Sequence, residues 1–330
     1  MDTSPFLNWN GAQFASESEK AVVFQSLVAT VKFQPSLDDS LEAEALEFLT
    51  RMDLDNEQSA DDFLHSYGHT TDESLANFVQ CIVVLISSPN QSITTATMEM
   101  LGNLISRCSA EVLLALIKAD LIPQLIITLT PQSHSFAEAV DIHINVMKII
   151  VDSLWLSTPN GLRHLKIEDH NEQQAVHETV FQQVLSPSER YIWHLCANRY
   201  SIIDNEQSKN FLNLLAQLLE ISSYYQPTMY FVLHTPVFLT IPSCLTFFEI
   251  DNSIVNFLYF MIEVQREWSE HSGEMRQMGK RVTRQLRMEG IEDVIEAKLR
   301  NDQKERCGGD IVSNSIAWSN LLGMNLPRRW

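Results

Sequence analysis

The sequence predicts an all-α protein whose helices stack as repeats, and three observations carry this prediction. Apolar residues recur at spacings of three and four along the chain, without the two-residue alternation of a half-buried strand. Glycine accounts for only 10 of 330 residues, which disfavours folds rich in glycine turns and phosphate-binding loops. Two segments also match at an offset of 42 residues, and periods of this length are typical of stacked helical repeats.

Capping signals and prolines place the individual helices. Ser16 and Glu19 form a predicted capping box before the first apolar run, and Asp38 or Asp39 is positioned to cap a second helix. The acidic segment 53–62 predicts a turn with a weak helix. Prolines fall between the later helices or in their first turns. These later helices are expected at 72–87, 92–107, 109–119, 122–129, 135–156, 172–184, 187–200, 205–222, 227–233, 236–248, 252–271, 273–288 and 290–301.

Charge and periodicity divide the chain into three expected parts. Residues 1–70 form an acidic N-terminal helical cap, 71–301 form the repeats and end in a basic amphipathic helix, and 302–330 form a tail, either docked or mobile. Residues 1–80 hold 15 acidic and 3 basic side chains, whereas residues 275–288 hold five basic side chains and no acidic one.

The overall charge excludes several kinds of partner. Acidic residues outnumber basic ones by 42 to 23, which gives a net charge of −19. Such a protein is a poor binder of nucleic acid or of an anionic membrane surface. No apolar run approaches the roughly 20 residues of a membrane span, and the start of the chain lacks the pattern of a secretory signal. The five scattered cysteines have no Cys-x-x-Cys spacing, which indicates reduced thiols and a cytoplasmic location, with a nuclear one left open.

Segments 88–104 and 130–146 carry the repeat. Each begins with a hydroxyl residue, a proline and an amide, and each follows an apolar helix. A unit this thin cannot bury its own apolar faces, so neighbouring units must stack. Each segment has an asparagine 14 residues after its proline and an acid four residues before that asparagine, namely Glu99 and Asn103 in the first and Asp141 and Asn145 in the second.

This repeat resembles the armadillo family, and more broadly the HEAT/armadillo superfamily. Segment 101–104 (Leu-Gly-Asn-Leu) is similar to the end of that family's third helix. Segment 119–125 is similar to its link into the second helix, with Asp120 where glycine is usual, and 241–245 is similar to that link again. The resemblance implies a right-handed α-solenoid. It is good over about 72–150, changes register between 157 and 222, and is loose over 236–268.

The resemblance also implies a function. In armadillo proteins the third helices line a concave groove, and their asparagines grip the backbone of an extended peptide. Asn103 and Asn145 match those positions, and a primary amide can both donate to and accept from a peptide backbone. Glu99 and Asp141 stand where the family has tryptophan, one turn before each asparagine. We therefore expect a non-enzymatic interaction module that binds an extended or helical segment of a partner protein, and the carboxylates beside the amides favour a basic segment.

A second candidate surface is a basic stripe near the C-terminus. Spacings of four, four and three place its residues on one helical face opposite apolar ones. The stripe could bind an acidic motif or the acidic N-terminal part of another copy. It could equally be a solvated face that pairs with neighbouring acids. Its members are Arg276, Lys280, Arg284 and Arg287.

The chain shows no motif of an enzyme. Glycine-rich phosphate loops, a nucleophile elbow and a two-histidine zinc helix are not found in the sequence. The prediction is therefore that no catalytic residue, cofactor or metal is involved. Two alternatives remain open. One is a regulatory or scaffolding subunit of a larger enzyme complex of the phosphatase or kinase type, and the other is a self-associating structural protein. The expected state is a monomer or a weakly self-associating species.

Overall fold

The computed structural model describes residues 16–34, 37–52, 56–129, 140–197 and 205–222, together with single positions between 224 and 288. The chain divides into two compact units, of which the first comprises 1–191 with 201–203 and the second comprises 192–200 with 204–330. The sequence-based division into a cap, repeats and a tail stays a prediction.

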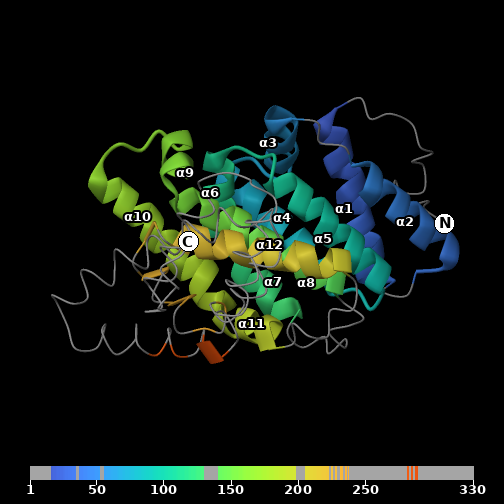
Figure 1. Ribbon diagram of the computed structural model, residues 1–330. Coiled ribbons are helices and arrows are strands. Elements are labelled where there is room, and N and C mark those ends of the chain that lie inside the picture. The colour runs from blue at the N-terminus through green and yellow to red at the C-terminus, as the bar shows by residue number, and fades with distance from the viewer. Residues whose placement is uncertain are drawn as a thin grey trace, which may run out of the picture. The chain divides into compact units, whose positions relative to one another are not determined.

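Every element in the described residues is helical and no strand occurs among them, which confirms the all-α prediction (Figure 1). A 3-10 turn (η2, Trp155–Ser157) precedes α9, and a π-helical turn (η3, Phe181–Leu185) joins α10 to α11 (Ser186–Ala197). The last helix described in full is α12 (Asn205–Ser222). The helices of the first unit are α1 (Glu17–Phe33), α2 (Asp39–Arg51), α3 (Glu57–His65), α4 (Thr71–Ile86), α5 (Gln91–Ile105), α6 (Ala110–Lys118), α7 (Leu121–Leu129), α8 (Val140–Leu154), α9 (Pro159–His164) and α10 (His170–Val180).

Side-chain caps begin these helices where the sequence predicts them. The hydroxyl of Ser16 accepts a hydrogen bond from the backbone N–H of Glu19 at 3.3 Å, and the carboxylate of Asp38 accepts one from Leu41 at 2.9 Å. Each bond satisfies an N–H group that has no partner within its helix. Other helices begin in the same way at Asn56, Thr70, Asn90, Ser109, Thr158 and Asp169.

The helices of the first unit pack in two rows (Figure 1). In one row α1 packs against α4 and α4 packs against α7. In the other row α2 packs against α5 and α5 packs against α8. The shorter α3 lies against α1 and α4, and α6 lies against α4, α7 and α8. Helices three places apart in the chain are therefore neighbours in space.

Aromatic side chains fill the core where α1, α3 and α4 meet. The rings of Phe24, Phe63 and Phe78 are fully buried. The Phe24 and Phe63 rings meet edge to face with centroids 5.9 Å apart, and the Tyr67 and Phe63 rings do so at 5.4 Å. Such pairs each add about 0.5–1.5 kcal/mol beyond their area burial. This cluster joins α1 to α3 and α4.

Asp120 joins α6 to α7 in a left-handed backbone conformation with φ of 62°. Its N–H donates to the carbonyl oxygen of Ile117 at 3.1 Å, which closes the end of α6. Glycine adopts this conformation without a steric penalty, whereas other residues adopt it at a cost.

No single helix in the described part of the chain is both long and apolar enough to cross a membrane. Helices α6 and α7 reach the length and apolar composition of a membrane span only when they are counted together, and they meet at an angle of 56°. Within the first unit, buried apolar side chains of this pair include Leu116, Ile117, Leu121 and Leu125.

Candidate functional site

The candidate site begins on the solvent-facing side of α5. Glu99 and Asn103 are both exposed, while their neighbours Met98, Leu101 and Leu104 are buried. Residues four apart on a helix lie on one face. The first predicted pair therefore forms a polar stripe on α5 while the other side of the helix enters the core.

Helix α8 presents the second predicted pair. Asp141 is exposed and Asn145 is half-buried. The same face continues at spacings of three and four to Lys148 and Asp152, both half-buried. The sequence prediction stopped at Asn145, although this spacing alone would have extended the stripe to the last two residues.

Helices α5 and α8 lie side by side, and Gly102 marks their approach. A Cβ atom added to Gly102 would lie 4.0 Å from Cδ of Lys148. Asn103 follows Gly102 directly, and Asn145 lies one turn before Lys148. The structure thus brings the two predicted pairs onto adjacent helices. Within the described part of the chain, neither asparagine amide makes a hydrogen bond.

Asp152 has unsatisfied acceptor capacity on this face. Its Oδ2 atom is shielded from water and has no hydrogen-bond partner. Burial raises the pKa of the Asp152 carboxyl above its ordinary value of 3.8, and the nearby Lys148 ammonium opposes this shift. A cationic group from outside would stabilise this carboxylate in its charged form.

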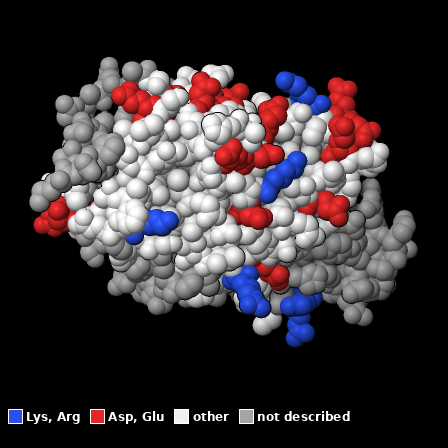
Figure 2. Space-filling view, turned by 180° about the vertical axis from the view of Figure 1, so that it is seen from behind, with Lys and Arg blue, Asp and Glu red and all other residues white. Residues whose placement is uncertain are grey.

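Helix α2 packs against α5 and adds further acidic side chains to this row. The three helices of this row hold four acidic residues on α2, one on α5 and two on α8, against two basic residues, Arg51 and Lys148. Arg51 is itself paired with Glu47 at 3.0 Å. The row α2, α5 and α8 is therefore negative. The molecular face shown in Figure 2 carries its charged side chains in small groups with broad uncharged areas between them.

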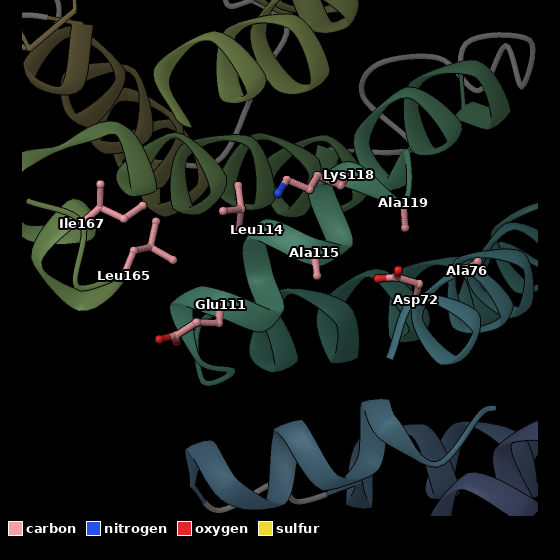
Figure 3. Close-up of a pocket in the computed structure, with 9 residues that line it drawn as sticks. All are labelled: Asp72, Ala76, Glu111, Leu114, Ala115, Lys118, Ala119, Leu165 and Ile167. Carbon is pink, nitrogen blue, oxygen red and sulfur yellow. The ribbon is translucent and has the colours of Figure 1, made fainter. Parts of the chain in front are cut away.

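A pocket lies elsewhere in the first unit, on the outer side of α6 (Figure 3). It has a volume of about 590 Å³. None of the four predicted groove residues lines it. Its lining comes from α4, α6 and the segment after α9, and consists of Asp72, Ala76, Glu111, Leu114, Ala115, Lys118, Ala119, Leu165 and Ile167.

The predicted basic stripe is only partly covered by the structure. Arg284 and Arg287 are exposed, whereas Arg276 and Lys280 lie outside the described residues. Arg281 is exposed as well. Its spacing of three from Arg284 makes the two residues neighbours on a helix, whereas its spacing of one from Lys280 places it beside the predicted stripe.

Among the described residues no group of three or more histidine, cysteine, aspartate or glutamate side chains is arranged to hold a metal ion. Cys81, Cys108 and Cys196, the described cysteines, are not joined in disulfides. Burial raises the pKa of the Cys108 thiol to about 12, so it is protonated at neutral pH and a poor nucleophile.

Comparison with known proteins identifies no relative: no family model matches the chain, and no curated protein matches it significantly. The armadillo resemblance therefore stays a hypothesis that depends on the repeat in the sequence.

Proposed function

We propose that this protein is a non-enzymatic, armadillo-like α-solenoid that binds a segment of a partner protein across the face formed by α2, α5 and α8. The observation that carries the proposal is the packing of these three helices in one row, with Glu99, Asn103 and Asp141 exposed and Asn145 half-buried on α5 and α8. The resemblance of segment 72–150 to armadillo repeats supports the same function.

The helix order supports a solenoid. Helices three places apart pack against each other in both rows, as expected when each three-helix unit stacks on the preceding one. The α6–α7 link is short and turns at the single residue Asp120. Segment 130–139, which contains the second Thr-Pro turn of the repeat, lies outside the described residues.

The amides of Asn103 and Asn145 suit the backbone of an extended segment. Each amide can donate one hydrogen bond to a peptide carbonyl and accept another from a peptide N–H. Such main-chain bonds provide affinity with little dependence on the partner's sequence. A row of amides on adjacent helices would hold an extended chain that crosses them.

The carboxylates would select the partner. Glu99 and Asp141 lie one turn before the two asparagines, and Asp152 adds a third carboxylate on α8. A lysine or arginine of the partner would pair with them, whereas an acidic segment would be repelled. The proposed partner is therefore a basic segment of another protein.

A direct test captures partner proteins from a native lysate with this protein and identifies them by mass spectrometry. The shortest partner segment that still binds is then synthesised, and its affinity is measured. At about 1 kcal/mol for each of the four hydrogen bonds lost, Asn103→Ala with Asn145→Ala should weaken this binding on the order of 1,000-fold. The exposed amides Gln80 and Asn171 lie on α4 and α10, so Gln80→Ala with Asn171→Ala is the matched control. Equal binding by both double variants would remove the assignment of this face.

Self-association is a second candidate function, favoured by the exposed arginines 281, 284 and 287 together with the acidic first 80 residues. Attraction between opposite charges on different copies would weaken as salt screens it. Light scattering at low and high ionic strength tests this candidate, and a strict monomer at low salt would exclude it. A regulatory subunit of an enzyme complex would use the same binding face.

A further inference from the structure

The pocket on α6 has an apolar floor with space above it. Three alanines, Ala76, Ala115 and Ala119, contribute small side chains to the lining, and Leu114 adds apolar surface on the same helix. Leu165 and Ile167 form the wall on the side of α9 (Figure 3). All of this surface is solvent-accessible to some degree, so an apolar group placed there would remove it from water.

Backbone hydrogen bonds hold the walls in place. Lys166 has a left-handed conformation with φ of 56°. Its N–H donates to the carbonyl oxygen of Arg163 at 3.0 Å, and the N–H of Ile167 donates to Leu162 at 3.1 Å. This pair of bonds is a Schellman motif, and it fixes Leu165 and Ile167 relative to α9. A preformed site loses little conformational entropy when it is occupied.

The start of α6 is anchored in a similar way. Ser109 caps the helix by accepting a hydrogen bond from Val112 at 3.3 Å. The N–H of Ser109 donates to the carboxylate of Asp61 in α3 at 3.0 Å. Glu111 therefore lies in a first turn that is tied to a neighbouring helix.

The polar lining lies at the rim. Its charged members are Asp72, Glu111 and Lys118, and all three side chains are exposed. Within the described residues none of the three forms an ion pair. A site for a small polar metabolite would have polar groups converging inside it. An apolar centre with a charged rim is instead the anatomy of a protein–protein interface.

We propose that this pocket binds a segment of a partner protein that carries one bulky apolar side chain next to a lysine or arginine. The apolar side chain would lie over Ala115 between α4 and the wall formed by Leu165 and Ile167. The basic side chain would pair with the carboxylate of Asp72 or with that of Glu111, which lie on opposite sides of Ala115 (Figure 3) and outnumber the one ammonium of Lys118. This site is separate from the α2, α5 and α8 face and does not use its asparagines.

The test probe is a phage-displayed library of random 12-residue peptides, selected on the full chain. We expect the recovered peptides to share a large apolar residue adjacent to lysine or arginine. A fluorescein-labelled synthetic copy is then titrated with each variant by fluorescence polarisation. Failure to recover such peptides, or recovery of acidic ones, would overturn the proposal.

Three variants locate the binding. Ala115→Trp fills the pocket and should weaken the peptide at least 10-fold, whereas Ala29→Trp on the exposed side of α1 should leave its affinity unchanged. Glu111→Lys reverses one rim charge and should also weaken binding, with little risk to folding because the side chain is exposed. Equal affinity of Ala115→Trp and Glu111→Lys with the unaltered protein would place the peptide elsewhere.

The asparagine variant separates this site from the proposed function. Asn103→Ala with Asn145→Ala should bind the library peptide with unchanged affinity. A loss of affinity in that variant would show that the peptide occupies the α2, α5 and α8 face, and the pocket assignment would then be wrong.

Discussion

The hydroxyl of Tyr191 lies 2.6 Å from Nδ1 of His143, so a hydrogen bond joins α11 to α8. The Tyr191 side chain is buried, and this burial raises the pKa of its hydroxyl far above 10, so the group is protonated at neutral pH. His143 lies two residues before Asn145 on α8. The bond therefore links a helix of the proposed binding face to the helix that follows α10.

Tyr191→Phe removes this hydrogen bond and retains the buried ring. We expect a loss of about 1 kcal/mol in the free energy of unfolding, measured by urea denaturation. Tyr224 is 46% exposed, so Tyr224→Phe is the control and should have little effect. Equal stability of the two variants would mean that the bond contributes nothing.

Two glycine substitutions should change stability in opposite directions. A Cβ at Gly161 would lie 2.6 Å from Cα of Leu156 and even closer to the carbonyl oxygen of Trp155. Because both neighbours are backbone atoms, Gly161→Ala should cost about 1–3 kcal/mol or more. A Cβ at Gly102 meets only Lys148 at an ordinary 4.0 Å, so Gly102→Ala should gain about 0.5–1 kcal/mol in the helix interior. Thermal denaturation of both variants tests the contrast.

Lys166→Gly should stabilise the fold. Lys166 has φ of 56° and an exposed side chain, and a residue with a Cβ pays about 1–2 kcal/mol in this conformation. Part of the gain is offset by the greater freedom of glycine in the unfolded chain, so we expect about 0.5–1 kcal/mol. Arg163→Gly, inside α9, should instead cost about 1 kcal/mol. A fall in melting temperature for Lys166→Gly would contradict the assigned conformation.

The stability of the chain should depend on pH through Asp152. Burial raises the pKa of this carboxyl in the folded chain above 3.8, so the folded state binds its proton more tightly than the unfolded state does. The ionised carboxylate therefore costs stability at neutral pH, and the cost disappears as the pH falls through the raised pKa. Asp152→Asn should be more stable than the unaltered protein at pH 7, with the difference shrinking on acidification. Glu99→Gln, an exposed site, controls for the loss of one charge, and a difference independent of pH would refute this assignment.

Much of the helical order could be predicted from local signals. The expected helices at 92–107 and 122–129 correspond to α5 and α7 within two residues at each end. Helix α9 was not expected, because Pro159 and Gly161 are typical of a turn. Thr158 in fact caps a short helix there, and Gly161 is needed for the close approach of the Trp155 carbonyl. Local sequence cannot reveal such an approach, because it depends on how the chain folds back.

The α5 polar pair could be predicted from the sequence, whereas the pocket could not. Glu99 and Asn103 could be placed on one face because helical spacing alone decides it. The pocket could not be predicted, because Asp72, Glu111 and Ile167 come from separate segments that only tertiary packing brings together. The position of α5 along α8, where Gly102 lies opposite Lys148, likewise depends on tertiary packing and could not be predicted.

The left-handed residue Asp120 separates two apolar helices, α6 and α7, that pack against different neighbours. Residues 110–129 are mostly apolar and would form a rod of about 30 Å as one helix, but Pro123 cannot occupy the interior of a helix without breaking or kinking it. The turn at Asp120 breaks this rod at an angle of 56°. Because of this bend, α6 lines the pocket while α7 packs against α4 in the row that begins with α1. The turn between them thus allows two helices that are adjacent in sequence to have different neighbours in the first unit.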